Sequence, residues 1–165
     1  DGLRSIIFTM PHIPNVKEKT LRYPGHIEKV LTLRDSGFFS EIPINIKGQE
    51  IIPLEFTSKI LFNEWELGSE EREQTIMRVT VSGTNKGVAE KIVYDLHDEY
   101  DPISQTSSMA RTTGYTATAA ANMLLEGLFQ EKGVFPPELV GKHARCFEYI
   151  MRYLKERNVI YHQKS

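Results

Sequence analysis

The stretch that decides the fold is Lys19-Thr20-Leu21-Arg22-Tyr23-Pro24-Gly25-His26. Residues 19–23 alternate polar and apolar side chains, a pattern that predicts a half-buried β-strand. Pro24 ends this strand and suits the first position of a helix, while Gly25 allows a tight turn of the backbone. The stretch therefore predicts a strand, a turn and the start of a helix.

The helix after this turn is predicted from the apolar spacing of Ile27, Val30 and Leu31. These residues stand at i, i+3 and i+4, which places them on one helical face. We expect Gly37 to end the helix in a left-handed conformation.

Three polar side chains of the opening stretch form a candidate binding site. Thr20 and Arg22 share one face of the predicted strand, and His26 opens the helix. A guanidinium, a hydroxyl and an imidazole near a helix N-terminus suit a carboxylate. The alternative is a surface strand with a solvated arginine, and the spacing alone leaves both open.

Three blocks of sequence carry a resemblance to a known family. The opening stretch leads into Ser36-Gly37-Phe38-Phe39, and two later blocks are Ser108-Met109-Ala110-Arg111-Thr112-Thr113-Gly114-Tyr115-Thr116 and Gly133-Val134-Phe135-Pro136-Pro137-Glu138. Together they resemble the C-terminal half of the saccharopine dehydrogenase family, which includes saccharopine reductases and lysine 6-dehydrogenases. The blocks stand in the family's order and span nearly the whole chain.

A β-hairpin is predicted in the middle of the chain. Residues 75–82 and 88–96 alternate in polarity, and the loop 83–87 between them is rich in residues that tolerate positive φ. The run after the hairpin holds His97, Asp98, Glu99 and Asp101. Because these residues are nearly consecutive and do not converge on one point, we expect a solvated strand end rather than a metal site. The charged run 70–73 predicts a solvated linker.

The remaining elements are read from periodicity and from proline and glycine. We expect a short strand within 41–46, a helix from about Pro53 to Gly68, and a last strand over 159–162. A long helix is expected from Pro136 to about Asn158, with an apolar stripe made of Leu139, His143, Phe147, Ile150 and Leu154.

A further helix is predicted from Thr113, after hydroxyl residues at 106–108 that can cap it. Its expected apolar face consists of Ala117, Ala120, Ala121, Leu124, Leu125 and Leu128. Small residues, hydroxyls and exposed N–H groups at its start suit a carboxylate or a phosphate. An ordinary, tightly packed helix explains the same composition.

The order of these elements predicts one α+β domain over residues 1–165, with a mixed, mostly antiparallel sheet and helices on one face. The resemblance implies the same two-layer architecture, related to the C-terminal domain of glyceraldehyde-3-phosphate dehydrogenase.

Composition excludes several classes of protein. The 165 residues are 40% hydrophobic and 25% charged, with a formal net charge of -2, which gives no electrostatic case for nucleic acid or an anionic membrane. The single cysteine, Cys146, excludes an intramolecular disulfide and a thiolate zinc cluster. No apolar run approaches a membrane span and no signal-peptide pattern is seen, so a cytoplasmic location is expected.

No dinucleotide-binding G-x-G-x-x-G follows a strand, and the nucleophile elbow G-x-S-x-G and the metalloprotease motif H-E-x-x-H are missing too. The resemblance implies an N-terminal Rossmann domain that this chain lacks. The chain also begins at Asp1, so we expect a fragment of a longer polypeptide, inactive alone, whose full-length enzyme uses NAD or NADP.

The resemblance implies hydride transfer at a C–N bond of saccharopine, lysine or a similar amino acid. Arg22 is the predicted carboxylate clamp, supported by Thr20 and His26, and the opposite wall is assigned to Thr113-Gly114-Tyr115. No general base is assigned. We also expect a homodimer, because the chain carries more apolar surface than one sheet face can cover.

Two other classes of function stay open. The chain could be a non-catalytic binding or dimerisation module. It could also be a stand-alone hydrolase that uses Ser107 or Ser108 with a histidine, although the elbow motif is missing.

Overall fold

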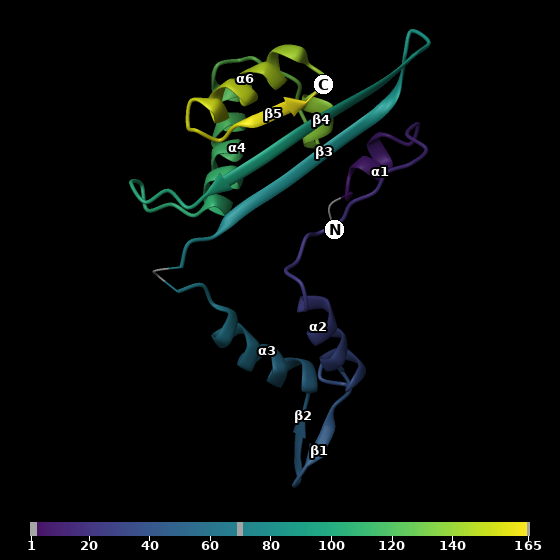
Figure 1. Ribbon diagram of the computed structural model, residues 1–165, viewed down its shortest axis with the longest axis vertical. Helices are drawn as coiled ribbons and strands as arrows, with labels where there is room; N and C mark the ends of the chain where they lie inside the picture. The colour runs from purple at the N-terminus through teal and green to yellow at the C-terminus, as the bar shows by residue number, and fades with distance from the viewer. Residues whose placement is uncertain (1–2, 69–70, 165) are drawn as a thin grey trace. The chain divides into compact units, whose positions relative to one another are not determined.

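The computed structural model describes residues 3–68 and 71–164. Residues 16–71 form one compact unit, here called the first unit, and residues 3–15 with 72–165 form the second unit. Figure 1 shows the elements of both. The expectation of a single domain over residues 1–165 stays a prediction.

The first unit holds two helices and a small hairpin. Its elements are α2 (His26–Asp35), β1 (Ile44–Ile46), β2 (Gln49–Ile51) and α3 (Pro53–Trp65). The two strands pair antiparallel, with Ile44 opposite Ile51. The predicted strand within 41–46 is thus confirmed in its second half.

The predicted limits of α2 and the predicted start of α3 are confirmed, whereas α3 ends at Trp65, three residues before the predicted stop at Gly68. Gly37 has φ 87°, in the left-handed region, and its N–H donates to the carbonyl of Arg34. That geometry ends α2 because a glycine has no Cβ to clash in this conformation. Pro53 occupies the first turn of α3, where its missing N–H costs no hydrogen bond.

The predicted strand over residues 19–23 is wrong. This segment has no regular secondary structure, and Leu21 and Tyr23 are 69% and 79% exposed. Alternating polarity only assigns side chains to faces, whereas a strand also needs a neighbour for its N–H and C=O groups. In the described part of the first unit, the only paired strands are β1 and β2.

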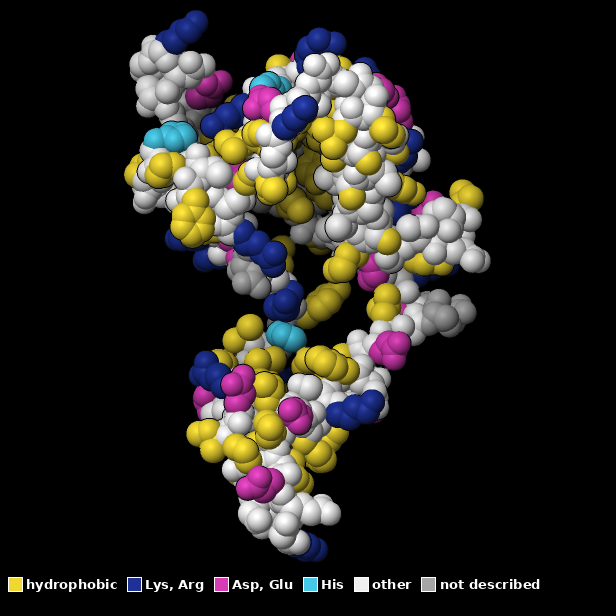
Figure 2. Space-filling view, turned by 180° about the vertical axis from the view of Figure 1, so that it is seen from behind, with side chains coloured by type: hydrophobic (Ala, Val, Ile, Leu, Met, Phe, Trp, Pro, Cys, Tyr) yellow, Lys and Arg dark blue, Asp and Glu magenta, His cyan; other side chains and the backbone are white. Residues whose placement is uncertain are grey.

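The first unit buries very little apolar surface of its own. Among its described residues only Thr57 is fully buried. Large hydrophobic side chains remain exposed over the unit, as Figure 2 shows. They include Leu21, Tyr23, Ile27, Phe38, Ile42, Phe56, Ile60, Phe62 and Trp65.

The second unit contains a three-stranded sheet and four helices within the described residues. They are α1 (Ile6–Thr9), β3 (Gln74–Asn85), β4 (Val88–Glu99), α4 (Ser108–Leu125), α5 (Pro137–Val140), α6 (Ala144–Lys155) and β5 (Tyr161–Lys164). The apolar segment at the N-terminus thus forms the short helix α1. The hydroxyl of Thr9 donates to Glu138 at 2.6 Å, which ties α1 to α5.

The sheet of the second unit confirms the predicted hairpin and is antiparallel in the order β3-β4-β5. The connecting turn is shorter than expected, since Lys86 and Gly87 alone link the paired residues Asn85 and Val88. Helices α4 and α6 cover one face (Figure 1), and Leu96 of β4 packs there with Leu154 and Val159. The fold class is therefore α+β with small antiparallel sheets, as predicted.

A second cluster holds α4 against α6. Met123, Phe129, Cys146 and Tyr149 are its buried residues. The hydroxyl of Tyr149 also donates to Glu126 at 2.6 Å, at the end of α4. These contacts explain how the two longest helices of the unit form one layer.

The predicted apolar face of α4 is wrong. The buried residues of the helix are Ser108, Arg111, Ala119 and Met123, whereas Leu125 is 85% exposed. The buried face includes a charged arginine whose charge is balanced inside the fold. A periodicity that counts only hydrophobic residues cannot find such a face.

The predicted long helix over 136–158 is also wrong. The chain forms α5 and α6 as separate helices, with Gly141 to His143 between them. Of the expected stripe, Leu154 is buried, whereas Phe147 is 43% exposed. The last strand, β5, begins two residues later than predicted.

Candidate functional site

Arg22 lies in an extended, exposed segment of the first unit, directly before α2. Its guanidinium donates only to the neighbouring carbonyl of Leu21, at 3.2 Å, and it has no ion pair among the described residues. Thr20 donates to Glu18 at 3.2 Å. An exposed guanidinium whose charge is not balanced can accept a carboxylate without breaking an existing pair.

His26 is the first residue of α2 and is half-buried. Its ring lies 6.2 Å from the ring of Trp65, centroid to centroid, with the planes tilted by 45°. Trp65 ends α3, so the two ring-bearing residues join the start of one helix to the end of the other. No sequence pattern predicted this pair, because the two residues are 39 positions apart.

Thr113, Gly114 and Tyr115 lie in the second turn of α4, so they do not form its N-terminus. Thr113 and Gly114 are exposed. Tyr115 is half-buried and packs against the Leu96 cluster, and the guanidinium carbon of Arg111 lies 5.8 Å from its ring centroid. Successive helical residues point about 100° apart, so the side chains of Thr113 and Tyr115 point in nearly opposite directions, and Gly114 between them has no side chain.

The N-terminus of α4 already holds a carboxylate from this chain. Glu73 accepts hydrogen bonds from the backbone N–H and the hydroxyl of Ser108, and Thr75 contacts the same hydroxyl at 2.7 Å. The hydroxyl of Ser107 accepts the N–H of Ala110, which confirms the predicted cap. The sequence therefore indicated the anion-binding character of this helix start, but the anion seen is internal.

The prediction of a solvated linker over residues 70–73 is therefore wrong at Glu73, which is half-buried under α4. Glu70 lies outside the described residues.

Arg111 is a structural arginine. Its Nε lies 3.1 Å from Oδ2 of Asp98, and Nη1 lies 3.3 Å from Oδ2 of Asp101. A further hydrogen bond of 3.1 Å reaches the carbonyl of Arg157, at the end of α6. Arg111 thus ties α4 to β4 and to the end of α6, and its charge is balanced within the fold.

The prediction of a solvated strand end is therefore wrong for Asp98, which is 5% exposed. The prediction is right for His97 and Glu99, which are exposed. Nε2 of His97 lies 3.4 Å from Oε1 of Glu99. The pKa of Asp101 is lowered, first by the hydroxyl of Ser104, then by the N–H of Ile103, and also by the charge of Arg111. A carboxylate with these donors stays ionised at neutral pH.

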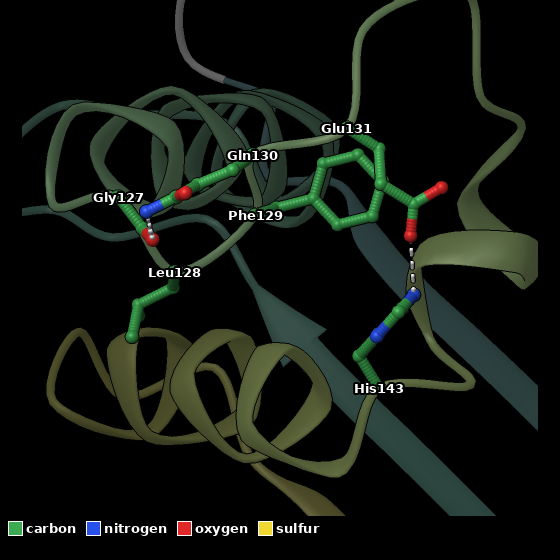
Figure 3. Close-up of a pocket in the computed structure, with 6 residues that line it drawn as sticks. All are labelled: Gly127, Leu128, Phe129, Gln130, Glu131 and His143. Carbon is green, nitrogen blue, oxygen red and sulfur yellow. Dashed lines mark hydrogen bonds and ion pairs between the residues drawn. The ribbon is translucent and has the colours of Figure 1, made fainter.

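A hollow of about 460 Å³ lies where the chain leaves α4. Figure 3 shows its lining, which consists of Gly127, Leu128, Phe129, Gln130, Glu131 and His143. His143 directly precedes α6, and its Nε2 lies 3.3 Å from Oε1 of Glu131. None of the six candidate substrate residues lines this hollow.

Within residues 3–68 and 71–164, no group of three or more His, Cys, Asp or Glu side chains is arranged to hold a metal ion. Within the same residues, no helix has both the length and the apolar character to cross a bilayer.

Comparison with known families identifies the chain. The saccharopine dehydrogenase C-terminal domain matches residues 3–160. Because this match covers nearly the whole sequence, the chain belongs to the saccharopine dehydrogenase family, through its C-terminal domain. The resemblance carried by the three sequence blocks is confirmed.

Proposed function

We propose that this member of a family of oxidoreductases is the substrate-binding part of an NAD(P)-dependent enzyme. The enzyme acts on the C–N bond of saccharopine, lysine or a similar amino acid. The observation that carries this proposal is the family match over residues 3–160, supported by the open guanidinium of Arg22.

Arg22 is the proposed clamp for the substrate's carboxylate. Arg111 and Arg78 are each balanced by aspartates, Asp98 and Asp95 respectively, so neither is open to a ligand in the same way. A guanidinium can hold a carboxylate through two parallel hydrogen bonds, which fixes orientation as well as affinity. Thr20 and His26 support this site from the same segment.

We propose to add Trp65 to this group. Its indole is 58% exposed and lies beside His26. An exposed aromatic ring next to an imidazole gives an apolar surface for the methylene chain of an amino acid, while Arg22 takes the charged end. Thr113, Gly114 and Tyr115 stay predicted substrate-binding residues, and the general acid or base stays unassigned.

The cofactor and its domain come from outside this chain in the proposal. NAD or NADP binds a Rossmann domain in the longer polypeptide, whose fingerprint is missing from these 165 residues. The enzyme is proposed to work in the cytoplasm as a homodimer. The exposed apolar side chains of the first unit support further packing against another surface.

The experiment compares this chain with the longer polypeptide that carries the Rossmann domain. For the chain alone, calorimetry should show no micromolar binding of NAD or NADP. An activity assay of the chain alone should show no reduction of either cofactor. The longer polypeptide should reduce one of them with saccharopine or lysine as substrate. If it binds the amino acid but reduces neither cofactor, the chain is a non-catalytic binding module instead.

A further inference from the structure

Strand β3 is an edge strand of unusual length. All 12 of its residues pair with β4, and within the described residues no second strand pairs with it. Natural proteins protect long edges with proline, lysine, bulges or shortness. The strand Gln74-Thr75-Ile76-Met77-Arg78-Val79-Thr80-Val81-Ser82-Gly83-Thr84-Asn85 has no proline or lysine, and its register with β4 is continuous.

The turn of the hairpin determines which backbone groups are free. Lys86 and Gly87 have φ 49° and 84°, as in a type I′ turn, so Asn85 and Val88 form a hydrogen-bonded pair. Such pairs alternate along an antiparallel ladder. Odd-numbered residues of β3 therefore bond to β4, and the N–H and C=O groups of even-numbered residues point to the open edge.

The side chains along this edge are apolar and exposed. Met77, Val79 and Val81 share the face that carries the helices, and they are 41%, 43% and 60% exposed. The only charge within the strand is Arg78, which is held by Asp95 at 2.6 Å. The edge thus combines free backbone groups with apolar side chains and little charge.

We propose that β3 pairs antiparallel with β3 of a second copy of this chain, about a two-fold axis at Val79. Because both strands present their even-numbered residues, the axis must pass through a residue rather than between two residues. Centred on Val79, the ladder joins Gln74 to Thr84 of the second copy and so uses nearly the whole strand. The three-stranded sheet becomes a six-stranded sheet that spans both copies.

Side-chain matching selects this register. An axis at Val79 pairs Val79 with itself and Met77 with Val81, so three apolar pairs line one face. An axis at Arg78 would place two arginines opposite each other, which is unfavourable. An axis at Thr80 would leave Met77 opposite Gly83, with less apolar contact.

This inference rests on the proposed homodimer and adds the surface that forms it. The test is Val79→Cys, analysed on non-reducing gels after mild oxidation. Residues opposite each other in a non-hydrogen-bonded pair have Cα atoms roughly 4.5 Å apart, which is within disulfide reach. We expect a disulfide-linked dimer. The chain's own Cys146 is 1% exposed, so the unaltered chain should stay uncrosslinked.

The matched control is Val88→Cys, which is 68% exposed on β4 of the same hairpin and should not crosslink. A second variant, Val79→Lys, should weaken dimerisation about tenfold or more in sedimentation, because two ammonium groups would meet at the axis, whereas Val88→Lys should not. A dimer that neither crosslinks through residue 79 nor responds to Val79→Lys overturns the β3 interface and leaves the homodimer standing. A chain that stays monomeric at high micromolar concentration overturns both.

Discussion

Arg111 binds Asp98 with Nε 3.1 Å from Oδ2, and both residues are less than a tenth exposed. The arginine belongs to the block Ser108–Thr116 that carried the family resemblance, and the aspartate belongs to strand β4. The arginine of this block therefore holds the fold together, whereas Arg22 in the opening stretch remains open to a ligand.

Asp98→Ala should lower the free energy of unfolding by about 3–5 kcal/mol, because it leaves the buried guanidinium of Arg111 without its main partner. Urea denaturation followed by circular dichroism measures the change. Asp95→Ala is the control, since it removes a carboxylate from ion pairs at the exposed face of the same strand and should cost much less. Equal losses in the two variants would contradict the structural role of the buried pair.

Arg22→Ala in the full-length enzyme should weaken binding of the reacting substrate by roughly 1.5–3 kcal/mol, as expected for a charged hydrogen bond. Arg22→Lys should restore part of this loss, because an ammonium lacks the planar fork. The measurement is kcat/KM. Arg34→Ala, at an exposed arginine of α2 that pairs with Asp35, serves as the control and should leave kcat/KM unchanged. An unchanged value for Arg22→Ala would remove this residue from the site.

Asp95 should make the stability of the second unit depend on pH. Hydrogen bonds from Arg78 and then Lys164 lower the pKa of this carboxyl, and they join β3 and β5 to β4. A lowered pKa means that the stabilisation is complete above the unfolded value, near pH 4, and is lost as the pH falls through the folded value.

Asp95→Asn should therefore flatten the fall in the free energy of unfolding between about pH 5 and pH 2. Urea titrations of both proteins across this range give the comparison. Because the pairs are exposed, 1 M salt should reduce the difference at neutral pH. Parallel pH curves for the two proteins would show that this carboxylate does not contribute.

Helices α2 and α3 should exchange their amide hydrogens faster than α4 and α6. The first unit has only Thr57 fully buried among its described residues, whereas α4 and α6 bury Met123, Cys146, Tyr149 and Leu154. Amide protection follows the free energy of local opening, which falls when little apolar surface is buried. Hydrogen exchange with mass spectrometry tests this, and equal protection in the four helices would refute it.

The sequence by itself determined the elements that depend on local chemistry. Gly37 ends α2 through its positive φ, Pro53 begins α3, and Ser107 caps α4, because each effect lies within one turn of the chain. The alternation on both sides of Lys86-Gly87 determined the hairpin in the same way. The three sequence blocks also indicated the family, because motifs are recognised from the order of residues alone and need no knowledge of tertiary contacts.

The tertiary structure alone decided which polar groups are buried and which segments pair. Glu73 reaches Ser108 and Asp98 reaches Arg111 across 35 and 13 positions, and no periodicity records such partners. The alternating segment 19–23 stays outside any sheet because a strand depends on a neighbour that the sequence does not name. Local rules act through the backbone of one turn, whereas burial of charge depends on groups brought together only by the folded chain.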